Sequence, residues 1–299
     1  MNRSVERTLI RYALFARLQE ATLMQHIKQA RLSNKALMPS PGFGTWQLRG
    51  QQCTRAVKEA LQVGYRHIDT AEVYENEKAV GQGIQDFPRE QLFLTSKVFH
   101  GNLREKSVLA ACSASLQRLG TNYLDLYLIH WPDMSVPLAE TLRAMKSLRS
   151  SDKIRAFGVS NFTIAHLREA LQQCDDSLPL CCNQVELHVG LWQKELVDFC
   201  KEQGIAVTAY SPLGRATILP DPTIRKIAQR RGCSPAQVCL AWLMHHGSVP
   251  LPKASSMGHM KENLEASQIA LDETDMQALD ALGNCERIID PGFAEFDKV

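Results

Sequence analysis

The sequence has little excess charge of either sign and no long apolar run. Its 34 lysines and arginines are nearly matched by 32 aspartates and glutamates, so the formal net charge is +2. This balance gives no electrostatic argument for binding nucleic acid or an acidic membrane surface. No apolar run approaches the length of a membrane span. We therefore expect neither a nucleic-acid partner nor a membrane partner.

Cysteine pairs with Cys-x-x-Cys spacing are also absent. The chain has nine cysteines, and most lie in apolar periodic segments. This usage is typical of reduced, buried cysteines, so we expect a cytoplasmic protein. The positions are Cys53, Cys112, Cys174, Cys181, Cys182, Cys200, Cys233, Cys239 and Cys285.

The first 23 residues differ in pattern from the rest and have no evident signal-peptide cleavage site. Apolar residues keep a helical period there, with arginines between them. Glu6 and Glu20 disfavour a transit peptide, because such peptides are poor in acidic residues. We expect residues 1–23 to be an extension outside the folded domain, read from an upstream start or forming a loosely attached helix. Met24 is then the natural start, and residues 24–299 form a single domain.

Short apolar strands alternate with amphipathic helices through the rest of the chain. A hairpin with its turn at 33–35 is predicted first. Strands are predicted at 41–45, 65–69, 92–97, 124–130, 156–160, 181–186, 205–211 and 247–252. Helices are predicted at 51–63, 76–85, 104–119, 137–150, 163–173, 192–203, 222–232 and 259–266, with additional ones at 235–245 and 273–283. This alternation predicts a (β/α)₈ barrel. A doubly wound open sheet is the alternative, but no Gly-x-Gly-x-x-Gly turn follows the first strand.

Most of the predicted strands end on polar residues. In a (β/α)₈ barrel the chemistry takes place at the carboxyl ends of the strands. One polar strand end would be ordinary, but many converging on one rim indicate an active site. These positions are Trp46, Asp69, Lys97, His130, Ser160, Asn161, Gln184, Tyr210, Ser211 and Lys253.

The segment 64–77 places a carboxylate and a phenol at one strand end. Tyr65, His67 and Asp69 fall on one face of an extended segment, because side chains alternate along a strand. Tyr74 follows on the loop. The pair Asp69 and Tyr74 is a candidate proton-transfer site. The alternative is an N-cap aspartate and a surface tyrosine.

Several long motifs, in the correct order, resemble those of the aldo-keto reductase family over about residues 25–295. They lie at 42–46, 64–77, 95–97, 128–132, 158–162, 183–186 and 209–214. Within the family, the short connecting loops and the segment 284–291 resemble the bacterial 2,5-diketogluconate reductase B type, which is also a methylglyoxal reductase. The resemblance implies NADPH-dependent reduction of small aldehydes, α-ketoaldehydes or keto-sugar acids, without a metal.

The resemblance also implies roles for individual residues. The four catalytic positions match Asp69, Tyr74, Lys97 and His130, with Tyr74 as the general acid. Among the positions that bind NADPH, those for the carboxamide match Ser160, Asn161 and Gln184, and the ring that stacks on the nicotinamide matches Tyr210. Those beside the pyrophosphate match Ser211, Leu213 and Gly214, and those at the adenosine end match Lys253, Ser255 and Asn263. The substrate-binding positions match Trp46, His130 and Trp131.

The residue types agree with this chemistry. A free tyrosine has a pKa near 10, and an ammonium such as Lys97 lowers it. Asp69 can hold the ammonium in place, and His130 can orient the carbonyl oxygen. No amino-acid side chain supplies a hydride, so a cofactor is required.

The loop at 252–263 departs from the family pattern because it contains no arginine to bind the 2′-phosphate of NADPH. Lys253 and Ser255, with His259 or Lys261, must serve instead. A lysine lacks the bidentate fork of arginine, so we expect a smaller preference for NADPH over NADH.

Two other functions are compatible with the sequence. One is a barrel aldolase that uses Lys97 as a Schiff base. The other is a non-catalytic NADP-binding module that senses redox state. The leading interpretation is a monomeric reductase of a small-molecule carbonyl substrate.

Overall fold

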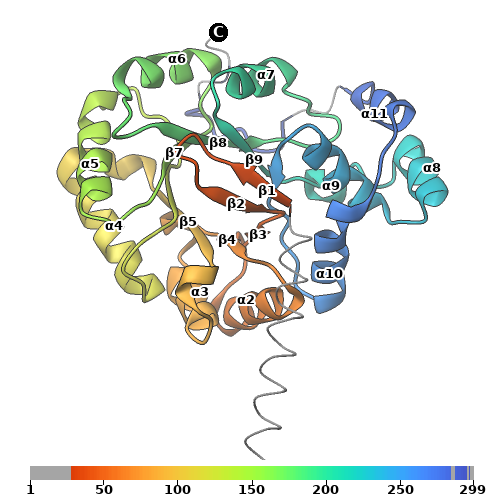
Figure 1. The fold of residues 1–299 in the computed structure, drawn as a ribbon, viewed down its shortest axis with the longest axis horizontal. Helices are drawn as coiled ribbons and strands as arrows, with labels where there is room; N and C mark the ends of the chain where they lie inside the picture. Colours follow the sequence, from red (N-terminus) through yellow and green to blue (C-terminus); the bar gives the residue numbers. More distant parts are fainter. Residues whose placement is uncertain (1–27, 284–286, 295, 297–299) are drawn as a thin grey trace, which may run out of the picture.

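The computed structural model describes residues 28–283, 287–294 and 296, and its core is an eight-stranded parallel sheet (Figure 1). The strands lie side by side in chain order. They are β3 Phe43–Gly44, β4 His67–Asp69, β5 Phe93–Val98, β6 Leu126–Ile129, β7 Phe157–Ser160, β8 Leu180–Glu186, β9 Ala206–Tyr210 and β10 Val249–Pro250. The predicted extension at 1–23 and the predicted start at Met24 lie outside the described residues.

Backbone hydrogen bonds close the sheet between its first and last strands. The N–H of Gly42 donates to the carbonyl of Pro250 at 3.0 Å, and that of Gly44 to the carbonyl of Pro252 at 3.1 Å. A Cβ on Gly44 would lie only 2.8 Å from the carbonyl oxygen of Leu251, so this approach requires glycine. The closed sheet confirms the predicted (β/α)₈ barrel and excludes the doubly wound open sheet.

Helices surround the barrel on its outer face (Figure 1). They are α2 Gly50–Val63, α3 Glu77–Ile84, α4 Glu105–Leu119, α5 Leu138–Ser150, α6 Ile164–Gln173, α7 Lys194–Glu202, α8 Pro222–Arg231, α9 Pro235–His245, α10 Met257–Glu265 and α11 Glu273–Asp280. Among the described residues, no helix is long and apolar enough to cross a membrane.

The roles predicted for the last helices are partly wrong. We placed 222–232 among the regular barrel helices and 235–245 among the additional ones. In the structure α9 packs against β10 and is buried continuously from Val238 to Leu243. Helix α8 lies at the periphery, between α9 and α11 (Figure 1). The physical reason is that α9 is apolar around its whole circumference, so it needs cover on all sides.

Buried apolar side chains form two layers, one between the sheet and the helices and one inside the barrel. Tyr65 belongs to the outer layer, where its hydroxyl donates to the carbonyl of Met260 in α10 at 3.2 Å. The prediction that Tyr65 shares a face with His67 and Asp69 is therefore wrong. Regular alternation starts only at His67, where β4 begins.

The predicted hairpin is confirmed, and it covers the amino ends of the barrel strands. It consists of β1 Lys28–Arg31 and β2 Leu37–Ser40, drawn in red across the barrel in Figure 1. Its turn residue Ser33 donates from Oγ to the carbonyl of Leu180, the first residue of β8, at 3.1 Å. The hairpin adds Leu32 and Met38 to the apolar layer inside the barrel. The opposite rim is left for the chemistry.

The eight cysteines among the described residues are all free, as predicted, and six of them are buried. Burial raises the pKa of Cys182 to about 12 and that of Cys53 to about 11, so these thiols are protonated at neutral pH. Cys285 lies outside the described residues.

Candidate active site

The predicted site residues gather at the carboxyl ends of the strands. Asp69, Ser160 and Tyr210 end β4, β7 and β9, while Trp46, His130 and Lys253 follow β3, β6 and β10 within three residues. Lys97 is the penultimate residue of β5, and Gln184 lies within β8. The strand pattern thus placed these residues at the correct end of the barrel.

Lys97 is fully buried and contacts two of the other predicted catalytic groups, Asp69 and Tyr74. Its Nζ donates to Oδ1 of Asp69 at 2.5 Å and to the carbonyl of Thr70 at 2.9 Å. The same nitrogen lies 3.5 Å from the hydroxyl of Tyr74. A buried ammonium needs such partners to offset its lost hydration. Asp69, Lys97 and Tyr74 therefore form one contiguous chain of polar groups.

Burial and the Asp69–Lys97 pair set the charges in this chain. Burial lowers the pKa of Lys97, but the Asp69 carboxylate and the Tyr74 hydroxyl raise it, and the pKa ends above its ordinary value. Burial raises the pKa of Tyr74, and Lys97 opposes this only in part. We expected Lys97 to lower the pKa of Tyr74; it acts in that direction, but burial outweighs it. At neutral pH, Lys97 is an ammonium and Tyr74 is a protonated phenol.

His130 lies beside the Tyr74 ring. The ring centroids are 5.7 Å apart and the ring planes are 76° apart, so the contact is edge to face. Burial, together with the charges of Lys97 and His100, holds the pKa of His130 well below its usual range. The imidazole is therefore neutral and can donate a hydrogen bond to a carbonyl oxygen.

The predicted carboxamide-binding residues form a second hydrogen-bonded set. Ser160 Oγ donates to the carbonyl of Gln184 at 2.8 Å, and the Tyr210 hydroxyl donates to Oδ1 of Asn161 at 2.9 Å. Gln184 Nε2 donates to Oδ2 of Asp69 at 2.9 Å. One of the two N–H groups of the Gln184 side-chain amide is thus already used within the protein. This contact joins the second set to the Asp69–Lys97–Tyr74 chain.

The loop that carries Tyr74 is held by Asn76, which the sequence indicated only as the start of the predicted helix 76–85. Asn76 is buried, and its Nδ2 donates to the carbonyls of Thr45 at 2.8 Å and Leu48 at 3.1 Å. Its Oδ1 accepts from the Thr70 hydroxyl at 2.8 Å. These contacts fix the loop after β4 to the loop after β3, which carries Trp46. Only the partners across the barrel reveal this role, because Asn76 alone reads as a helix N-cap.

Comparison with known proteins identifies the protein family of this chain. The model of the aldo/keto reductase family matches residues 42–284. The chain belongs to the aldo/keto reductase family.

Relatives of this aldo/keto reductase include proteins with named activities. The chain is 43% identical over 261 residues to a glyoxal reductase of Bacillus subtilis, which covers 86% of this chain and 94% of the relative. A solved structure described as a putative 2,5-diketo-D-gluconic acid reductase B is 35% identical, with a TM-score of 0.87 over 91% of this chain and 97% of that one. A second structure, an aldo-keto reductase complexed with NADPH, is 32% identical, with a TM-score of 0.84 over 90% and 91%.

The loop after β9 brings the predicted pyrophosphate residues of this reductase to the rim. Ser211 and Gly214 both have left-handed backbone, with φ of 48° and 54°. Leu213, between them, packs against the outer apolar layer. Arg215 directly follows the motif at 209–214, and its guanidinium carbon lies 4.8 Å from the centroid of the half-exposed Trp46 ring. The loops after β9 and β3 therefore meet across the mouth of the barrel.

Two of the predicted adenosine-binding residues lie just before α10, and the third lies within it. Lys253 and Ser255 are both exposed. The helix begins at Met257, and Ser256 is its N-cap, accepting from the N–H of His259. Asn263 lies within α10 and is buried. The structure brings the first two residues to the surface beside the rim, but not Asn263.

The C-terminal segment lies against the predicted substrate residue Trp131. Phe293 meets the Trp131 ring edge to face, with centroids 5.6 Å apart, and stacks near His100 at 4.5 Å. The buried carboxylate of Glu186 accepts from the backbone N–H groups of Ile288 at 2.9 Å and Ile289 at 2.8 Å. Sequence reasoning missed this anchor, since nothing in the motif around Glu186 indicates its partners.

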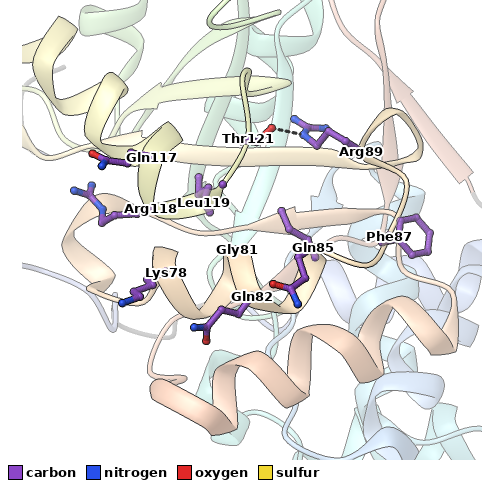
Figure 2. Close-up of a pocket in the computed structure, with 12 residues that line it drawn as sticks. Lys78, Gly81, Gln82, Gln85, Phe87, Arg89, Gln117, Arg118, Leu119 and Thr121 are labelled. Carbon is purple, nitrogen blue, oxygen red and sulfur yellow. Dashed lines mark hydrogen bonds between the residues drawn. The ribbon is translucent and has the colours of Figure 1, made fainter.

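A surface cavity of about 630 Å³ lies away from the rim, between α3 and the end of α4 (Figure 2). Its arginines already have partners within the protein: Arg89 binds Thr121 and Asp125, and Arg118 binds Glu77. None of the predicted site residues lines it. Across the described part of the chain, no cluster of three or more histidine, cysteine or acidic side chains is arranged to hold a metal ion.

Proposed function

We propose that this aldo/keto reductase uses NADPH to reduce the carbonyl of small aldehydes, α-ketoaldehydes or keto-sugar acids, with Tyr74 as the general acid. The observation that carries the proposal is the chain from the buried Asp69 and Lys97 to the half-buried Tyr74 at the rim, with His130 beside it. These groups offer a protonated donor, a fixed positive charge and a neutral hydrogen-bond donor within a few ångströms of one another.

The rim residues fit a nicotinamide cofactor. Tyr210 offers a partly exposed ring whose hydroxyl is fixed by Asn161, so the ring can stack against a flat heterocycle. Ser160, Asn161 and Gln184 supply the hydroxyl and amides beside it. The side chain of Gln184 donates from Nε2 to Asp69, and its side-chain oxygen Oε1 can accept from a carboxamide. NADPH, when bound, supplies the hydride that no side chain can provide.

The side chains deliver the proton. The substrate oxygen gains negative charge as the carbonyl carbon is reduced, and the Tyr74 hydroxyl donates its proton to that oxygen. Lys97 then stabilises the phenolate that remains, and Asp69 holds Lys97 in place. His130, being neutral, orients the carbonyl oxygen by a hydrogen bond.

Similarity to the glyoxal reductase of Bacillus subtilis supports α-ketoaldehydes as substrates, and similarity to the putative 2,5-diketo-D-gluconic acid reductase B supports keto-sugar acids. Trp46 offers an exposed aromatic ring at the rim, whereas Trp131 is buried beneath Phe293. We expect the relative rates to be set by these side chains and by the loops around them. A cytoplasmic, monomeric protein remains a prediction.

The aldolase alternative conflicts with the state of Lys97. An amine must be neutral to form a Schiff base, whereas Asp69 helps to hold the pKa of Lys97 above its ordinary value. The non-catalytic redox-sensing alternative would suit a broken catalytic set, but all four groups are present.

The test is a panel of aldehydes, including glyoxal and methylglyoxal, with NADPH and NADH, followed by loss of nicotinamide absorbance. Turnover with at least one dicarbonyl is expected. Tight NADPH binding without turnover of any carbonyl would favour the redox-sensing module, and covalent trapping of substrate by borohydride would favour the aldolase.

A further inference from the structure

Tyr74 lies in a segment with little regular structure. The segment consists of one short 3-10 turn, Glu72–Tyr74, between β4 and α3. Within the turn, the N–H of Tyr74 donates to the carbonyl of Ala71, and Glu75 has left-handed backbone with φ of 55°. Such a turn does not by itself fix a phenol relative to a neighbouring strand. Its position depends on contacts made by side chains at its two ends.

Asn76 provides the contact at one end, and Glu72 provides it at the other. Oε2 of Glu72 accepts from the backbone N–H of Phe99 at 2.9 Å, and Oε1 accepts from Nδ2 of Asn102 at 3.0 Å. Phe99 follows β5 directly, two residues beyond Lys97. Both oxygens of Glu72 therefore bind the segment that continues from the strand carrying Lys97.

We propose that Glu72 is a positioning residue, which holds the hydroxyl of Tyr74 within reach of Lys97. The inference rests on the role of Tyr74 given under Proposed function. The distance from Lys97 Nζ to the Tyr74 hydroxyl is 3.5 Å, at the long limit of a hydrogen bond, so a small outward movement of the turn breaks the contact. Hydrogen bonds to a carboxylate are about twice as strong as neutral ones, which suits Glu72 to resist that movement.

The geometry predicts which substitutions preserve this function. Glu72→Gln keeps one oxygen for the Phe99 N–H, and Asn102 can turn its amide to present Oδ1 to the new NH₂ group. Glu72→Ala removes both contacts. Asn102→Ala removes one contact and leaves the Phe99 bond. The expected order of activity is wild type, then Glu72→Gln, Asn102→Ala and Glu72→Ala.

Glu140 offers a matched control. Its carboxylate also links two elements, accepting from the N–H of Glu105 at 3.1 Å and from Arg104 at 2.9 Å. It contacts none of the groups placed in the site. Glu140→Ala should therefore leave the rate of reduction unchanged.

The experiment measures single-turnover oxidation of enzyme-bound NADPH by saturating methylglyoxal, together with KM and the NADPH Kd. Misplacing a reacting group by about 1 Å can cost about a hundredfold, so Glu72→Ala should lower the single-turnover rate roughly ten- to a hundredfold. In Glu72→Ala, KM and the NADPH Kd should stay within about twofold of the wild-type values. Glu72→Gln should keep roughly a third or more of the wild-type single-turnover rate. In the Tyr74→Phe background, Glu72→Ala should have no further effect.

A wild-type rate in Glu72→Ala, or equal losses in Glu72→Ala and Glu140→Ala, would overturn the proposal. If Glu72→Ala does not fold, the decision passes to Asn102→Ala, where a fall of roughly threefold or more supports it and an unchanged rate overturns it. An active Tyr74→Phe enzyme rejects the general-acid assignment instead. An inactive Tyr74→Phe with a fully active Glu72→Ala rejects only the positioning role.

Discussion

Gln184 Nε2 donates a 2.9 Å hydrogen bond to Oδ2 of Asp69, while Oδ1 of the same carboxylate binds Lys97. Asp69 thus stands between the residues proposed to bind the nicotinamide and those proposed to move the proton. A change at Gln184 should therefore affect the chemical step as well as cofactor binding.

Gln184→Glu is expected to make the rate of reduction fall as the pH rises from about 6 to about 8. At pH 8 the new carboxylate faces Asp69, and like charges at this distance disfavour ionisation of both. The single-turnover rate should fall at least tenfold, roughly, at pH 8 and recover towards pH 6, where the introduced carboxyl group is protonated and again donates to Asp69. Rates measured from pH 6 to 9 on both enzymes test this, and a pH-independent loss in the variant would contradict it.

His67 is expected to destabilise the protein in mild acid. Its ring nitrogens lie 3.2 Å from the Pro39 carbonyl and 3.0 Å from the Thr95 hydroxyl, and burial lowers its pKa to about 4. The unfolded chain binds a proton at this imidazole below about pH 6.5, whereas the folded protein does not until about pH 4. Stability from this group is therefore present above pH 6.5 and is lost as the pH falls through that window, by roughly 2 kcal/mol at pH 5.

Urea unfolding of wild type and His67→Leu at pH 8 and pH 5 measures this loss. The substitution also alters the packing at both pH values, so the quantity compared is the change in the free energy of unfolding between them. That change should be smaller in His67→Leu by roughly 2 kcal/mol. The same acid-induced change in both proteins would show that His67 does not carry the effect.

Lys253 is expected to contribute to the choice of cofactor. It is exposed just beyond β10 and near the start of α10, and no arginine lies in the loop 252–263. A charged hydrogen bond is worth about 1.5–3 kcal/mol, so Lys253→Ala should weaken NADPH binding roughly ten- to a hundredfold. NADH binding should barely change, because NADH carries no 2′-phosphate.

Dissociation constants for both cofactors, measured on wild type, Lys253→Ala and the exposed control Lys78→Ala, decide this point. Lys78 lines the cavity between α3 and α4, and none of the predicted cofactor-binding residues lines that cavity (Figure 2). Equal losses for NADPH and NADH, or none for either, would remove Lys253 from the phosphate site.

The sequence could predict the barrel and the rim because both depend on local pattern. Parallel strands covered on both faces read as apolar runs, and the carboxyl ends of such strands meet at one rim, which brought Asp69, Lys97 and His130 together. The same reasoning failed for Tyr65, because the two-residue alternation begins only at His67, where β4 begins, and Tyr65 precedes it. It also confused α8 with α9, because helical periodicity shows that a helix forms but not which neighbours cover it.

The supporting contacts could not be predicted, since each joins residues far apart in sequence. Glu72 binds Phe99 and Asn102, and Glu186 binds backbone about a hundred residues later. A carboxylate in a loop has the same local pattern whether it faces water or holds a neighbouring segment. The direction of the pKa shift of Tyr74 could not be predicted either, because it depends on how far burial, which raises the pKa, outweighs the charge of Lys97, which lowers it.

The most direct test of the account is the rate of carbonyl reduction by Tyr74→Phe, measured in a single turnover with bound NADPH. The substitution removes only the hydroxyl that lies 3.5 Å from Lys97 and leaves the ring against His130. Loss of a positioned general acid typically costs about 10²–10⁴-fold, so the rate should fall by that factor while the NADPH Kd stays within about twofold. A Tyr74→Phe enzyme that reduces methylglyoxal at the wild-type rate would contradict the proposed mechanism.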